Sequence, residues 1–141
     1  MPVFPSKEWC EEVARLTNAD PESAAAGQGW EGDFGAIIEA EQGKLASPFA
    51  VHWIPKNGRI SQMRVLGDPD ELEEIEPSYL ARAPYSIWKG MIQGKLDPME
   101  QLVKRRLTIT GDAQPLIERI RYKGIGARIL SKLSTEFADE L

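Results

Sequence analysis

The sequence predicts an α+β fold, in which a mostly antiparallel, twisted sheet of about five strands carries helices on one face. Two observations favour this class. The spacing of apolar residues is helical near the N-terminus and alternates from Trp30 to Glu41. Residues 85–112 then read as helix, helix and strand, and a further helix is expected to follow. A chain of 141 residues fits a single domain, 1–141.

Two helices are expected before the sheet. Ser6 can cap a first helix that ends near Asn18. Its apolar residues share one stripe, namely Trp9, Val13 and Leu16. Residues 20–27 have a cap residue, a proline at the first helical position and a terminal glycine, which together predict a second short helix.

An alternating stretch from Trp30 to Glu41 predicts a half-buried strand. One face carries Phe34, Ala36, Ile38 and Ala40, and the other carries Asp33, Gly35, Ile37, Glu39 and Glu41. Further strands are expected at 49–54 and 60–66. The acidic segment 67–77 predicts a solvated loop or a short exposed helix, and 79–85 adds a strand.

The Asn57-Gly58 dipeptide predicts a hairpin turn between the second and third strands. A two-residue loop would pair Trp53 with Gln62, whereas a longer loop would pair Trp53 with Met63. Both pairings stay open from the sequence.

Residues 85–94 predict a helix capped by Ser86, with Trp88, Met91 and Ile92 on one face and a left-handed stop at Gly94. A second helix is predicted from Asp97-Pro98, because these residues supply a cap and a first-turn proline.

In that second helix, Leu102 and Val103 are expected to face inward. Leu107 to Thr110 predicts a strand, and Gly111-Asp112 turns the chain and caps the next helix. Three apolar residues mark that helix: Leu116, Ile117 and Ile120.

The C-terminal residues predict a last amphipathic helix. Gly124 and Gly126 are expected to interrupt the helical pattern. The apolar residues of the final helix are Ile129, Leu130, Leu133 and Phe137.

Several motifs that resemble catalytic or metal sites lack the structural context that such sites need. Residues 27–32 match a dinucleotide fingerprint, but no strand precedes them and no helix follows. Asp33-Phe34-Gly35 matches the letters of a kinase metal-binding motif, but no kinase catalytic loop or glycine-rich strand pair lies near it. His52 and Cys10 stand alone, so we predict no catalytic residue, no metal site and no cofactor.

Charge and cysteine content narrow the function classes further. The net charge is −5 and the sequence pI is about 5.0, which argues against nucleic-acid binding. One cysteine fits a reducing compartment. No segment is long and apolar enough for stable membrane insertion, and the N-terminus lacks a signal-peptide pattern, so we expect a cytoplasmic protein.

The segment from Gly94 to Asp112 resembles the sterol carrier protein family, also called the non-specific lipid-transfer domain. The resemblance is carried by Gly94-Lys95-Leu96-Asp97-Pro98, the basic run Lys104-Arg105-Arg106, and Leu107-Thr108-Ile109-Thr110-Gly111-Asp112. It implies an apolar cavity between the helices and the sheet. It also implies non-catalytic binding and transfer of a fatty acid, fatty acyl conjugate, sterol-like molecule or phospholipid.

The resemblance implies which side chains line the cavity. The candidate ligand-binding residues are Phe34, Trp88, Met91, Ile92, Leu102, Leu107, Ile109, Leu116, Ile129 and Leu133. The candidate headgroup ligands are Lys104, Arg105 and Arg106, whose alternative role is to balance the dipole at an exposed helix end.

Two other function classes stay open. The chain could be an interaction module with a filled core that docks on an enzyme of lipid or acyl metabolism, using its acidic segment. An enzyme is the third reading and the least supported. We expect a monomer or homodimer, with the glycines at 124 and 126 allowing the final helix to move for ligand uptake.

Overall fold

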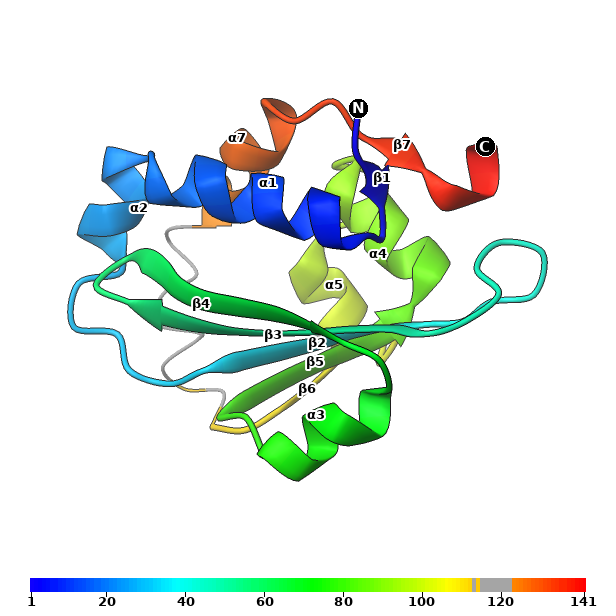
Figure 1. The fold of residues 1–141 in the computed structure, drawn as a ribbon, viewed down its shortest axis with the longest axis horizontal. Helices are drawn as coiled ribbons and strands as arrows, with labels where there is room; N and C mark the ends of the chain where they lie inside the picture. Colours follow the sequence, from blue (N-terminus) through cyan, green and yellow to red (C-terminus); the bar gives the residue numbers. More distant parts are fainter. Residues whose placement is uncertain (113, 115–122) are drawn as a thin grey trace.

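The computed structural model describes residues 1–112, 114 and 123–141, and within these ranges a mixed five-stranded sheet forms the centre of the molecule (Figure 1). The strand order is β4-β3-β2-β5-β6. The strands are β2 (Phe34–Glu39), β3 (Phe49–Lys56), β4 (Arg59–Leu66), β5 (Tyr79–Pro84) and β6 (Thr108–Thr110). Within this five-stranded sheet, β2 and β5 pair in parallel and the other described neighbours pair antiparallel. The predicted α+β class with a mostly antiparallel sheet is confirmed.

Most helices lie on one face of the sheet (Figure 1). They are α1 (Lys7–Asn18), α2 (Pro21–Ala26), α4 (Tyr85–Ile92), α5 (Pro98–Val103) and α7 (Lys123–Ser131). The predicted caps are present: Ser6 Oγ accepts from the Trp9 backbone N–H at 3.1 Å, and Asp20 Oδ1 accepts from that of Glu22 at 2.9 Å. Local cap chemistry therefore sets the ends of α1 and α2.

The acidic segment forms a short, mostly exposed helix, α3 (Pro69–Ile75), which is one of the two alternatives that the sequence left open. This helix covers the opposite face of the sheet (Figure 1). Leu72 of α3 is fully buried against Ile37 and Ala50. The prediction that β2 is only half buried is therefore wrong, since Ile37 is 1% exposed. The other α3 side chains are mostly charged and exposed, which hides the one apolar anchor from a pattern search.

The β3–β4 hairpin combines both of the pairings that the sequence left open. Lys56 pairs with Arg59, so Asn57 and Gly58 form a two-residue loop. A bulge at Ser61 then shifts the register, and Trp53 pairs with Met63. The bulge was not predicted, yet it places apolar side chains opposite one another on the helix-covered face.

We expect Gly58→Ala to lower the free energy of unfolding by about 2 kcal/mol or more, and Gly43→Ala by only about 1 kcal/mol. The two glycines have nearly equal φ angles, 79° and 78°. A Cβ at Gly58 would lie 2.4 Å from the Ala24 Cα of α2, whereas one at Gly43 meets nothing within 4 Å. Urea unfolding of both variants checks this, and equal losses would contradict a close approach of α2 to the hairpin.

The predictions for α4 and α5 need two corrections. Helix α4 begins at Tyr85, and Ser86 does not cap it, because the Ser86 N–H and Oγ–H both donate to Glu41 Oε1 at 2.9 Å. In α5 the inward residue is Gln101, which is 1% exposed, while Val103 is 79% exposed. Val103 is the last residue of α5 and lies on the outer surface of the helix. Asp97 caps α5 and Gly94 is left-handed, as predicted.

The C-terminal segment also differs from the expectation. Helix α7 includes Gly124 and Gly126 and ends at Ser131, so the glycines do not interrupt it. Phe137 lies in β7 (Glu136–Phe137), which pairs in parallel with β1 (Val3–Phe4). The predictions for Leu116, Ile117 and Ile120 fall outside the described residues.

A short 3-10 helix, η2 (Ala138–Glu140), follows β7 and is fastened to α4. Asp139 accepts hydrogen bonds from the Tyr85 hydroxyl at 2.8 Å and from Lys89 Nζ at 2.9 Å. The segment after α7 is thus tied to the helical layer by polar contacts.

Candidate functional site

The helix-covered face of the sheet is apolar across its strands. Two neighbouring rows of paired residues cross it, Met63–Trp53–Phe34–Tyr79 and Val65–Val51–Ala36–Ala81–Ile109. Cross-strand partners point to the same side of a sheet, so these side chains form one continuous apolar floor beneath the helices. Ala36 and Ala81 have small side chains, so the centre of this floor lies close to the sheet backbone.

Phe34 stands in a row of stacked aromatic rings at one end of the floor. Its ring centroid lies 5.4 Å from that of Trp53, 5.2 Å from that of Tyr79 and 5.7 Å from that of Trp30. Phe34 is therefore packed mainly by the protein's own rings. It can contact a ligand only along its remaining edge.

Trp88 and Ile92 of α4 are part of the packed core. Both pack on the cluster of Phe4, Ile38 and Tyr85, and the Trp88 indole Nε1–H donates to the Ile37 carbonyl at 3.0 Å. This hydrogen bond fixes the indole over β2. These two predicted ligand-binding residues can form one wall of a ligand site. Their side chains already pack against the protein's own core.

The remaining predicted residues come from several elements. Leu107 and Ile109 belong to the segment of β6, whereas the other described ones come from α4, α5 and the segment from α7 onward. Ile109 pairs with Ala81 on the floor, and Leu107 and Ile129 are each 5% exposed. Within the described ranges, none of the three core clusters includes Ile109, Leu107 or Ile129. Three more of these residues are half-buried or border another surface hollow: Met91, Leu102 and Leu133. Leu116 lies outside the described residues.

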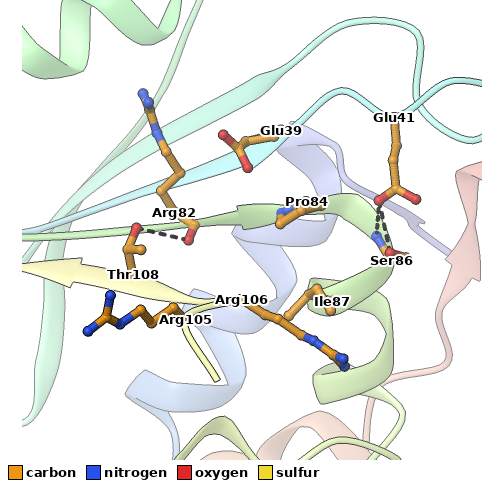
Figure 2. A pocket seen from close by; sticks show the side chains of 9 residues that line it. All are labelled: Glu39, Glu41, Arg82, Pro84, Ser86, Ile87, Arg105, Arg106 and Thr108. Carbon is orange, nitrogen blue, oxygen red and sulfur yellow. Dashed lines mark hydrogen bonds between the residues drawn. The ribbon is translucent and has the colours of Figure 1, made fainter. Parts of the chain in front are cut away.

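The predicted headgroup residues do not stay together. Arg105 and Arg106 line a surface hollow, whereas Lys104 is turned away and pairs with Glu100 of α5 at 2.6 Å. Other residues of the hollow were not predicted, and they are Glu39, Glu41, Arg82, Pro84, Ser86, Ile87 and Thr108 (Figure 2). No strand pattern in the sequence places Arg82 near Glu39, because their shared face depends on the parallel pairing of β2 with β5.

Glu41 is the best-held carboxylate of this hollow. The Ser86 backbone N–H and hydroxyl both donate to it, and Lys44 lies 3.4 Å away. The backbone hydrogen bond from Ser86 contributes most to a lowered pKa of Glu41, which burial opposes. Glu41 therefore stays ionised and joins the segment that follows β2 to the start of α4.

His52 and Asp33 form a polar tie on the α3 side of the sheet. His52 Nε2 lies 2.6 Å from Asp33 Oδ2, and the Ser78 backbone N–H donates to Asp33 Oδ1 at 2.8 Å. Burial raises the pKa of Asp33, but the hydrogen bonds from His52 and Ser78 outweigh it and lower the pKa to about 2. The pair joins β2, β3 and the residue before β5.

This tie predicts a specific loss of stability in acid. The folded pKa of Asp33 lies below its usual value of 3.8, so its contribution is present at higher pH and is lost as pH falls from about 4 to 2. We expect Asp33→Asn to destabilise the protein at pH 7 and to flatten its stability profile in that acid range. Urea unfolding at several pH values checks this, with Glu31→Gln as the exposed control. Equal profiles for wild type and Asp33→Asn would contradict it.

The other reactive side chains give no chemical centre in the part of the chain that is described. Cys10 is packed on Ala36 and Val51, and burial raises the pKa of its thiol to about 12. Among the described residues, no three His, Cys, Asp or Glu side chains are grouped so that they could hold a metal ion.

No helix in the described ranges has the length and apolar character needed to cross a membrane.

The fold resembles those of solved structures of sterol carrier proteins. A crystal structure of sterol carrier protein 2 superposes with a TM-score of 0.76 at 17% identity, covering 92% of this chain and 98% of that one. The chain has the sterol carrier protein 2 fold. A conserved hypothetical protein from Thermus thermophilus, described as a candidate sterol carrier protein, gives a TM-score of 0.73 at 15% identity, covering 93% of this chain and 90% of its own.

Sterol carrier protein domain 2 of Helicoverpa armigera shares this fold with a TM-score of 0.60 at 13% identity, covering 96% of this chain and 99% of its own. The sequence itself matches no protein-family model and no curated protein. At such low identities the agreement concerns the sterol carrier protein 2 fold.

Proposed function

We propose that this chain reversibly binds and transfers an apolar ligand, such as a fatty acid, fatty acyl conjugate, sterol-like molecule or phospholipid, without chemical conversion. The observation that carries the proposal is the continuous apolar floor beneath the helices, in a fold shared with sterol carrier protein 2 over 92% of the chain. The proposed ligand lies between that floor and the helices, in the cytoplasm.

The physical basis is the removal of methylene groups from water. Each buried methylene contributes about 0.8 kcal/mol, so a long acyl chain gains on the order of 10 kcal/mol before ordering costs are subtracted. A net gain of about 8 kcal/mol corresponds to micromolar binding. An apolar floor supplies this term without any catalytic group.

The β5–β6 side is the best place for the tail. Ala81 is small, Ile109 is half-buried beside it, and Leu107, which immediately precedes β6, is buried. The ring row at Phe34 and the wall at Trp88 bound this region from β2 and α4. The proposal keeps the other ligand contacts predicted from the sequence, which are Met91, Ile92, Leu102, Leu116 and Leu133.

Ligand uptake on this proposal requires α7 to move. Arg128 of α7 forms an ion pair with Asp20 at 2.7 Å, and Asp20 is 6% exposed at the start of α2. Arg128 also lies 3.4 Å from Glu22, and Ile129 of α7 is 5% exposed, so moving α7 breaks both ion pairs and exposes Ile129. Hydrogen exchange in α7 should slow when lipid is added, and unchanged exchange would count against α7 as the cover.

Displacement of a fluorescent fatty acid tests the proposed function directly. We expect unlabelled palmitate to displace the probe with micromolar affinity and one-to-one stoichiometry. Octanoate serves as the short-chain control, and it should bind more weakly because it buries fewer methylenes. Equal displacement by both acids, or no saturable binding, would reject the carrier function.

The exposed acidic side of α3 favours one alternative, an interaction module. Asp70, Glu71, Glu73 and Glu74 all lie on this short helix and are mostly exposed, while Leu72 anchors it. Such a surface suits a basic partner, for example an enzyme of lipid or acyl metabolism. A filled interior without lipid binding, together with partner binding that α3 charge reversal abolishes, would favour this module.

A further inference from the structure

Gln101 is fully enclosed, although its side chain is polar and belongs to a short helix, α5. It is 1% exposed, and the other residues of α5 are half-buried or exposed. Its side-chain Oε1 has no hydrogen-bond partner among the described residues. A buried amide oxygen without a partner lowers stability, so this oxygen needs a donor that the described part of the chain does not supply.

The other buried side-chain atoms that lack a hydrogen-bond partner in the described ranges are accounted for by charge or exposure. Asp20 Oδ2 and Arg128 Nη2 lie 2.7 Å apart and form an ion pair. Arg82 Nε belongs to a side chain that is 39% exposed and reaches Glu73. Within the described residues, neither an ion pair nor solvent satisfies the Gln101 oxygen, because this side chain is neutral and enclosed.

The backbone of Gln101 is held against the start of β6. Its carbonyl accepts from the Arg106 N–H at 2.9 Å and from the Leu107 N–H at 3.2 Å. Leu107 is buried and immediately precedes β6, whose Ile109 lies on the apolar floor. Gln101 therefore lies beside the residue that the proposed function assigns to the tail site.

The Gln101 side chain points from α5 into the interior of the domain. Helix α5 lies on the helix-covered face of the sheet (Figure 1). Pro98, Glu100 and Val103 are on its exposed side, whereas Gln101 is on its enclosed side. A ligand group that reaches the amide has to enter the layer between the helices and the sheet, which is where the proposed function places the ligand.

We propose that Gln101 is a specificity-determining residue of the tail site, whose amide oxygen accepts a hydrogen bond from the O–H group of a long-chain alcohol. The inference rests on the proposed function and specifies the polar end that the ligand carries into the interior. An amide oxygen is only an acceptor, so the ligand has to supply the donor. An ionised carboxylate and an ether have no donor, and burying a carboxylate beside a neutral amide costs more than burying a hydroxyl.

Displacement of the fluorescent fatty acid by dodecan-1-ol, undecyl methyl ether and dodecanoate tests this preference. The alcohol and the ether are isomers, but only the alcohol can donate a hydrogen bond. We expect dodecan-1-ol to bind about tenfold tighter than the ether or dodecanoate. Equal saturable binding by the three probes would overturn the role of Gln101 and leave the carrier function standing. Absence of saturable binding by all three would overturn the carrier function and this inference with it.

Gln101→Met is the matched variant, because methionine has nearly the shape of glutamine without its amide. It should abolish the preference for dodecan-1-ol over the ether. Gln93→Met makes the same exchange at an exposed position after α4 and should leave the preference at about tenfold. Circular dichroism checks that both variants are folded. A preference that persists in the folded Gln101→Met variant would overturn the proposal.

Urea unfolding of the ligand-free protein separates a ligand contact from a structural hydrogen bond. Replacing an unpaired amide by an apolar group of similar shape leaves no donor without its acceptor, so the urea midpoint of Gln101→Met should equal or exceed that of the wild type. A midpoint for Gln101→Met clearly below those of the wild type and Gln93→Met would mean that the amide is already paired within the protein. That result would overturn the proposal.

Discussion

Replacing Leu72 with alanine is expected to lower the free energy of unfolding by about 3 kcal/mol. Leu72 is 0% exposed and is the one buried side chain of α3. A Cβ at Gly35 would lie 2.7 Å from Leu72 Cδ1, so the leucine packs directly on the β2 backbone. Alanine would leave a cavity between α3 and the sheet that neither element can fill.

Ile75→Ala is the matched control for this loss. Ile75 belongs to the same helix but is 38% exposed, so its truncation should cost about 1 kcal/mol or less. Urea unfolding of the two variants gives the comparison. A Leu72→Ala loss no larger than that of Ile75→Ala would mean that α3 does not cover the sheet.

Leu107→Trp is expected to weaken fatty-acid displacement about tenfold or more, because the larger side chain occupies the space assigned to the tail. Leu107 is 5% exposed and immediately precedes β6, whose Ile109 lies on the apolar floor. Tryptophan adds volume at a closed position, so some loss of stability should accompany it. Displacement and thermal unfolding are therefore measured on the same preparation.

Val103→Trp controls for the effect of an added indole in the same segment. Val103 is 79% exposed, so its replacement should leave both displacement and stability unchanged. A folded Leu107→Trp variant that displaces the probe like the Val103→Trp control would place the tail site elsewhere.

Elements with local signals could be predicted from the sequence. Ser6, Asp20 and Asp97 cap helices as expected, because a cap depends only on residues within one turn. The same reasoning wrongly predicted that Ser86 caps α4. Its side chain and N–H bind Glu41, which is distant in sequence, and so tertiary contact overrides the local cap pattern.

Features that depend on pairing across the sheet could not be predicted. The bulge at Ser61 has no composition signal, yet it decides which side chains face Trp53. Arg82 and Glu39 share the hollow only because β5 pairs in parallel with β2. Leu72 is one of two apolar residues in an acidic run, and it is buried because α3 packs it over Gly35.

Native mass spectrometry of freshly purified protein tests the central claim most directly, namely that the space between the apolar floor and the helices holds an apolar guest. We predict a chain that carries one lipid-sized adduct, which delipidation removes and added palmitate restores. A bare monomer or homodimer mass that palmitate does not change would contradict the account and leave only the sterol carrier protein 2 fold.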